Sequence, residues 1–184
     1  MLKRQKDTNR FKLISYKIVL FVVIDLFKCL LYCNMDDNYI EINKALWNVK
    51  TDIHINSEFY DNENFLSGKS SLNKIELDLL GDITGKRILH LQCHFGQDTM
   101  SMARMGASCV GLDLSEKAVN YANETANSLN LDASFVTADI YDAPNLIDEK
   151  FDIVYTSYGT IGWLPDIHKW AEVVTHFLKP GGQL

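Results

Sequence analysis

The loop 92–98 (QCHFGQD) and Asp113 are the first features whose residue types and positions indicate chemistry. The loop joins an apolar segment, 87–91, to a segment with helical spacing. A tight turn of this kind lets backbone N–H groups and a helix N-terminus face a ligand. Asp113 closes the next apolar segment, 17 residues after Gly96. A carboxylate at that point can accept hydrogen bonds from both hydroxyl groups of a ribose.

A second aspartate, Asp139, follows the apolar segment 134–137 in the sequence ADI. Its carboxylate can accept a hydrogen bond from the amino group of an adenine, while Ile140 packs on the ring. Taken with Asp113, this residue indicates a site for an adenine nucleoside at the ends of successive strands.

The elements that must position these residues alternate between strand and helix. Periodicity and end signals predict strands at 87–91, 108–112, 134–137 and 151–156, and helices at 97–105, 115–129 and 167–178. Ser115 and Asp166 are the expected N-caps of the second and third helices. Strands spaced by helices indicate parallel βαβ units in an α/β sandwich, which binds ligands at the carboxyl ends of its strands.

The segment KPGG at 179–182 is predicted to be a turn before a fifth strand. Because only the first residues of that fifth strand, 183–184, are expected in this chain, the fourth strand, 151–156, is expected to form an exposed edge of the sheet. Upstream of the first strand, the aromatic-studded stretch 43–71 is expected to form a short helix followed by a loop, and 73–80 to form a second helix.

In this order the segments resemble the motifs of the class I S-adenosylmethionine (SAM)-dependent methyltransferases. The matching segments, between residues 85 and 184, are ILHLQCHFG, VGLDLS, TADIYD, FDIVYTSYG and LKPGGQL. The resemblance implies a Rossmann-like doubly wound α/β sheet of mainly parallel strands flanked by helices, with about four to five of the family's seven strands in this chain. It also implies SAM as the cofactor and a small-molecule methyl acceptor, but it names no catalytic residue. The stretch 47–80 resembles the lead-in of a bacterial subgroup of small-molecule-type methyltransferases.

The resemblance implies that nine residues contact the cofactor. They are Gln92, Cys93, His94, Gly96, Asp113, Leu114, Asp139, Ile140 and Tyr155.

The first motif departs from the family pattern of an acidic residue followed by three alternate glycines. Those positions hold His90, Gln92, His94 and Gly96, so only the last glycine is present. Non-glycine residues restrict φ and crowd the approach of the backbone to a ligand. Either the loop takes a variant path that His94 and Gln92 complete with side-chain hydrogen bonds, or the affinity for the cofactor is reduced. Because Asp113 and the later aspartate are in place, we favour the variant path.

Other sites and functions are less well supported by the residues. His90 and His94 lie on a strand and its following loop and share no helical face, and there is no HExxH, so no metal site is expected. An NAD(P)-binding protein is disfavoured because the sequence lacks G-x-G-x-x-G. A fragmentary or inactive methyltransferase-like domain stays open as an alternative.

Composition and charge limit the partners. Residues 1–34 hold seven Lys/Arg against two Asp, a net charge of +5, whereas the remainder holds 11 Lys/Arg against 22 Asp/Glu, a net charge of −11. An acidic body without a long basic run has no electrostatic footprint for nucleic acid, so no nucleic-acid partner is expected. The four cysteines form no CxxC pair, which is typical of reduced thiols in a cytoplasmic protein.

The sequence divides into an N-terminal extension at 1–34, a helical lead-in at 35–84 and a cofactor-binding domain at 85–184. The extension contains the apolar run IVLFVVI, and three interpretations stay open. It is a non-native or dispensable extension before a start at Met35, a membrane-associating helix within 12–33, or a signal peptide that lacks a clear cleavage site. Any membrane contact is expected through 12–33 alone.

Overall fold

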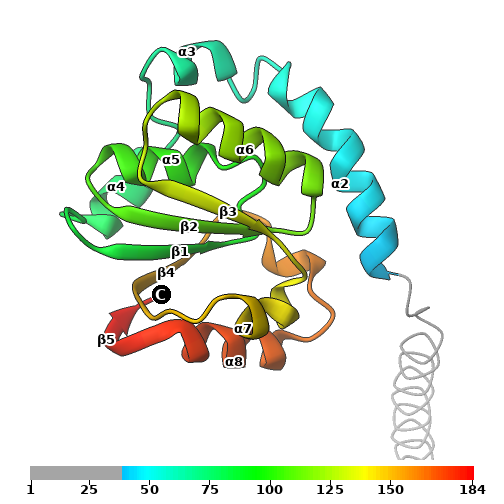
Figure 1. The fold of residues 1–184 in the computed structure, drawn as a ribbon, viewed down its shortest axis with the longest axis vertical. Coiled ribbons are helices and arrows are strands. Elements are labelled where there is room, and N and C mark those ends of the chain that lie inside the picture. The colour runs from blue at the N-terminus through cyan, green and yellow to red at the C-terminus, as the bar shows by residue number, and fades with distance from the viewer. Residues whose placement is uncertain (1–38) are drawn as a thin grey trace, which may run out of the picture. The chain divides into compact units, whose positions relative to one another are not determined.

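The computed structural model describes residues 39–184, and residues 40–184 form one compact unit. The N-terminal extension predicted at 1–34 lies outside the described residues. Five strands form one sheet, in which all pairings are parallel and the order is β3-β2-β1-β4-β5 (Figure 1). The strands are β1 (Arg87–Leu91), β2 (Ser108–Asp113), β3 (Ala133–Thr137), β4 (Phe151–Thr156) and β5 (Leu178–Gln183).

Helices cover both faces of this sheet. Figure 1 shows α5 and α6 on one face and α7 and α8 on the other. The helices are α2 (Tyr39–Ile55), α3 (Asn62–Leu66), α4 (Lys74–Leu80), α5 (Gln97–Arg104), α6 (Glu116–Ser128), α7 (Ala143–Leu146) and α8 (Ile167–Phe177), with 3-10 turns at Ile140–Asp142 and Ile161–Trp163. The predicted α/β fold of mainly parallel strands is confirmed. None of the helices described between residues 39 and 184 has the length and apolar character needed to cross a bilayer.

The central strand β1 is buried on both faces, which explains why Ile88, Leu89 and Leu91 are all apolar. Leu89 and Leu91 point into the core with α8, whereas Ile88 belongs to the core with α5. His90 shares the α5 face because side chains alternate along a strand. It is only 1% exposed and reaches across to Thr99 on α5. The sheet order reverses between β1 and β4, and the crevice at the carboxyl ends of these strands is where such folds bind ligands.

Two predicted helix starts are confirmed in detail. The Ser115 hydroxyl accepts a hydrogen bond from the backbone N–H of Ala118 at 3.2 Å and caps α6. The Asp166 carboxylate accepts from the N–H groups of His168 and Lys169, both at 3.0 Å, and caps α8. Each cap satisfies donors that a helix leaves without an internal partner.

The prediction of a turn at 179–182 was wrong, and so was the prediction that β4 is an exposed edge. Leu178 pairs with Phe151 and Gln183 pairs with Ile153, so the residues between them bulge within β5. Lys179 anchors this bulge through a 2.9 Å ion pair from its Nζ to Asp152 Oδ1. Glycines in the bulge permit the irregular path, and β4 therefore lies inside the sheet, between β1 and β5.

The lead-in also differs from the prediction, because α2 is a 17-residue helix and not a short one. The face that α2 packs against the domain is polar. Thr51 is fully buried, and Asn48 Oδ1 accepts a hydrogen bond from Ser115 Oγ at 2.7 Å. Several of its apolar side chains, such as Val49 and Ile53, are instead exposed. In most packed helices the apolar side chains face the protein, but in α2 several of them face away from it.

Gly111 on β2 provides a test of the packing under the loop that follows β1. A Cβ atom built on Gly111 would lie 2.4 Å from the Phe135 ring and 2.8 Å from Cys93 Sγ. We expect Gly111→Ala to lower the free energy of unfolding by about 1–3 kcal/mol, because overpacking a buried site forces its neighbours to shift. Urea denaturation measures the effect. Gly162→Ala is the control, since no atom lies within 4 Å of its added methyl group. Equal losses in the two variants would contradict the steric account.

Candidate functional site

The loop after β1 places three alternate residues in the left-handed backbone region. Gln92 has a φ of 57°, His94 of 53° and Gly96 of 78°. These are the positions at which the family pattern has glycine, the residue that adopts positive φ most readily. The loop thus keeps a glycine-like backbone although two of its glycines are replaced. Gly96 itself has no room for a side chain, because an added Cβ would lie 2.4 Å from the Phe135 ring.

The sequence favoured a variant path completed by side-chain hydrogen bonds. The hydrogen bonds are present, whereas the positive φ values are those that glycine adopts most readily. Gln92 Nε2 donates to the Thr160 carbonyl at 3.1 Å, which ties the loop to the segment after β4. His94 Nε2 and His54 Nδ1 on α2 share a hydrogen bond of 2.9 Å. The ring of Trp47, also on α2, lies edge-on to His94 with centroids 5.2 Å apart. Helix α2 therefore covers the loop, a role that sequence reasoning did not find.

Asp113 connects this loop to the start of α6. Its Oδ2 accepts the backbone N–H of His94 at 2.7 Å, and its Oδ1 accepts the N–H of Ser115 at 2.8 Å. The side chain is nearly buried, and burial raises the pKa of Asp113 while the two N–H groups act against that rise. Leu114 follows the end of β2 and lies between Asp113 and Ser115 in the sequence.

Asp139 lies beside Asp113 at the ends of neighbouring strands. The N–H of Ala138 donates to the Asp113 carbonyl at 3.0 Å, and Asp139 Oδ1 accepts the N–H of Tyr141 at 2.9 Å. The Asp139 side chain is only partly buried, so part of its carboxylate can still meet a ligand. Ile140 packs in the core against α8 at 5% exposure, and the ring contact predicted for it stays a prediction.

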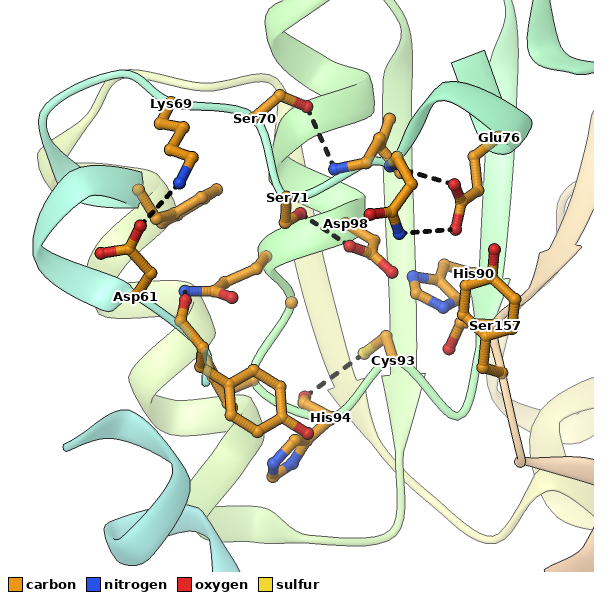
Figure 2. A pocket seen from close by; sticks show the side chains of 18 of the residues that line it. Asp61, Lys69, Ser70, Ser71, Glu76, His90, Cys93, His94, Asp98 and Ser157 are labelled. Carbon is orange, nitrogen blue, oxygen red and sulfur yellow. Dashed lines mark hydrogen bonds and ion pairs between the residues drawn. The ribbon is translucent and has the colours of Figure 1, made fainter. Parts of the chain in front are cut away.

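A cavity of about 630 Å³ opens beside the loop, on the β4 side of β1 (Figure 2). Three of the nine predicted residues line it, namely Cys93, His94 and Gly96. The other six lie outside its lining: Gln92, Asp113, Leu114, Asp139, Ile140 and Tyr155. About half of the lining comes from the segment 59–76 of the lead-in, and Ser157 and Tyr158 add the segment after β4. The structure thus separates the Asp113–Asp139 edge from this cavity, with the loop between them.

A comparison with known protein families identifies the family. Residues 88–182, just over half of the chain, match the family described as the methyltransferase domain. The chain belongs to the class I SAM-dependent methyltransferases. The resemblance on which the sequence analysis relied is thereby confirmed.

The relatives of this methyltransferase domain are distant. It is 26% identical over 132 residues to a ubiquinone biosynthesis O-methyltransferase of Alkalilimnicola ehrlichii, covering 70% of this chain and 53% of that protein. It is 32% identical over 118 residues to an uncharacterized methyltransferase of Synechocystis sp., covering 64% of this chain and 53% of that protein. The chain therefore spans about half the length of these curated relatives.

Solved structures agree on the fold. A TehB-like SAM-dependent methyltransferase from Corynebacterium glutamicum superposes with a TM-score of 0.53 at 20% identity, covering 63% of this chain and 61% of that one. A glycopeptide N-methyltransferase solved with SAM gives a TM-score of 0.52 at 22% identity, covering 59% and 49%. At these identities the likeness extends to the fold alone.

Two carboxylates that line the cavity, Asp98 and Glu76, were not among the nine residues predicted from the sequence. Asp98 lies in the first turn of α5, whose N-cap is Gly96, and its Oδ1 accepts the Ser71 hydroxyl at 2.6 Å. Glu76 on α4 accepts the N–H of Asn73 at 3.0 Å. The spacing Asn73-x-x-Glu76 is a capping box, a signal that was present in the sequence. The hydrogen bond from Ser71 to Asp98 has no comparable sequence signal, because the two residues are 27 positions apart.

Histidines in the site are held neutral. Burial lowers the pKa of His90 to about 3, and burial with the neighbouring His54 and Lys50 lowers the pKa of His94 to about 3. His90 Nδ1 shares a 2.8 Å hydrogen bond with Thr99 Oγ1, whereas His94 is bonded to His54. His90 on β1 and His94 in the loop therefore have separate partners. Among residues 39–184, no group of three or more His, Cys, Asp or Glu is arranged to hold a metal.

The depressed pKa of His90 predicts loss of stability in acid. His90 stays neutral in the folded state to about pH 3, while the unfolded chain protonates it near pH 6.5. The unfolded state therefore binds the extra proton, and stability falls as the pH falls from about 6.5 toward 3. The loss from this one residue is about 2 kcal/mol at pH 5 relative to pH 7.

The measurement compares the free energy of unfolding of the wild type and of His90→Asn at pH 7 and pH 5. The variant should show the smaller acid loss whatever its stability at pH 7. Parallel pH dependences would contradict the assignment.

Proposed function

We propose that this domain binds SAM across the carboxyl ends of β1, β2 and β3, and that the whole protein transfers its methyl group to a small-molecule acceptor. The observation that carries the proposal is the loop geometry. Gln92, His94 and Gly96 adopt positive φ, and the Asp113 carboxylate fixes the loop through the His94 N–H. This loop lies at the carboxyl end of β1, beside the point where the strand order reverses, which is where folds of this kind bind ligands.

The side chains present suit a polar ligand at this loop. Gln92 Oε1 and His94 Nδ1 are buried polar atoms without a hydrogen-bond partner among the described residues. Buried polar atoms without partners are costly in a folded protein, and a bound ligand can satisfy them. We assign Asp113 to the ribose hydroxyls and Asp139 to the adenine amino group. Cys93 and Leu114 flank the bound nucleoside, and Tyr155 lies toward the methionine portion.

When bound, SAM supplies a methyl group on a sulfonium, which is already a good leaving group. The residues of this chain then mainly orient the methyl donor and the acceptor and exclude water from them. Trp47 on α2 packs against His94 on one side and against Trp163 on the other, with ring centroids 5.3 Å apart in the second pair. This aromatic cover shields the loop from solvent. We assign no residue as a general base.

Isothermal titration with S-adenosylhomocysteine tests the proposal directly. We expect a saturable complex with one site per chain. A folded protein that does not bind would contradict the proposal and favour a methyltransferase-like domain without catalysis of its own.

Asp113→Asn tests the assignment of the ribose contact. The amide replaces one acceptor oxygen with a donor that opposes a backbone N–H, so the affinity for S-adenosylhomocysteine should fall about tenfold to a hundredfold. Asp132→Asn, an exposed aspartate outside the site, is the control and should bind as the wild type does. Thermal melting of both variants confirms that each is folded. An unchanged affinity of Asp113→Asn would contradict the assignment.

A further inference from the structure

One end of the cavity, which we call the acidic end, is formed by Glu76, His90, Asp98 and Tyr158. Figure 2 shows Glu76, His90 and Asp98 gathered there, while Asp61 and Lys69 lie at the opposite end. Glu76 comes from α4, Asp98 from α5 and His90 from β1. Three separate elements thus bring polar groups to one place, although none of these residues belongs to the nine predicted from the sequence.

The two carboxylates of the acidic end have no cationic partner among the residues that line the cavity. Lys69 is the single cation in that lining, and its Nζ forms a 2.7 Å ion pair with Asp61 Oδ2. Asp98 is bonded to the Ser71 hydroxyl, and Glu76 to Asn73 and to the Tyr158 hydroxyl. Negative charge is therefore balanced at one end of the cavity and unbalanced at the other.

The two carboxylates are close enough to affect each other. Burial raises the pKa of Asp98, and the charge of Glu76 raises it further. The pKa of Glu76 is lowered overall: burial acts to raise it, but the N–H groups of Glu76 and Asn73 and the Tyr158 hydroxyl outweigh burial. A positive charge placed between the carboxylates would relieve their repulsion.

His90 supplies an independent sign of a ligand at this end. Its side chain is only 1% exposed and lines the cavity, and its Nε2 has no hydrogen-bond partner among the described residues. In the tautomer whose Nδ1–H donates to Thr99, Nε2 is a lone-pair acceptor. A donor group that enters the acidic end can then bond to Nε2 and to a carboxylate together.

We propose that the acidic end binds a protonated amine of the methyl acceptor, so that the substrate class is an amine-bearing aromatic small molecule and not a carboxylate or phosphate ester. The aromatic part would lie against the rings of Phe59, Tyr60 and Phe95, which line the same cavity. This proposal rests on the proposed methyltransferase function. The amino group of the cofactor has the same chemistry, so the experiment must separate the two sources.

The test uses two probes of similar size, tyramine and 3-(4-hydroxyphenyl)propionate, which carry an ammonium and a carboxylate on the same phenol. Each is titrated by calorimetry into protein saturated with S-adenosylhomocysteine, which already occupies the cofactor site. We expect tyramine to bind at least tenfold more tightly than the propionate. Asp98→Asn should reduce tyramine affinity about tenfold, since one charge-assisted hydrogen bond is lost while an oxygen remains for Ser71.

Asp61→Asn is the matched control, because it removes the same charge from the same cavity but from the paired end. Asparagine also tolerates the left-handed backbone of residue 61. This control should keep the preference for tyramine. Glu76→Gln, which preserves the capping box, is a second variant if Asp98→Asn unfolds, and it should weaken tyramine binding in the same way.

The outcomes separate the possible sources. Loss of S-adenosylhomocysteine affinity in Asp98→Asn, with tyramine affinity unchanged, assigns the carboxylate to the cofactor and overturns the proposal. Equal binding of the two probes, or of neither, overturns it as well. If the wild type does not bind S-adenosylhomocysteine, the proposed function fails, and titration of the probes into the unliganded protein still decides the preference of the acidic end.

Discussion

The carboxylate of Asp113 joins the two turns between which the site is built. One oxygen holds the N–H of His94 in the loop after β1, and the other holds the N–H of Ser115 at the start of α6. Ser115 in turn is bonded to Asn48 on α2, so the covering helix is attached to the same point. A buried carboxylate is costly unless it is hydrogen-bonded, and these N–H groups supply that compensation. Asp113 therefore links the loop, the start of α6 and, through Ser115, helix α2.

The sheet could be predicted from the sequence because its strands are buried. Strands β1 and β4 were predicted with the bounds observed, since a short segment rich in apolar residues between polar turns is typical of a buried strand. The caps at Ser115 and Asp166 could also be predicted from the sequence, because a cap is a local interaction. The edge of the sheet could not be predicted in this way, because β5 pairs with β4 around a bulge that contains proline and glycine.

The site was only half predictable for a related physical reason. Asp113 and Asp139 lie at the ends of strands, so local sequence order makes them candidates for the site, and their contacts with a ligand stay a prediction. Asp98 and His54 act through partners 27 and 40 positions away, and only the folded chain brings these together. The packed face of α2 is polar, so its apolar pattern could not indicate where the helix lies. Gln92 and His94 in place of glycine predicted a variant path for the loop, yet both residues have positive φ and hydrogen bonds from their side chains hold them.

The parallel pairing of the sheet has a consequence for folding. Two adjacent parallel strands require a crossover connection, which here contains α5. Asp113 at the end of β2 therefore meets the loop after β1 only when β1 and β2 have paired. The hydrogen bond between His54 and His94 is a second non-local contact, which joins the loop to a residue 40 positions earlier in the chain. No hairpin-sized piece of this sequence contains the site, because its parts meet through non-local contacts alone. A ligand bound there stabilises the paired sheet as a whole, and the binding site is complete only when the domain has folded.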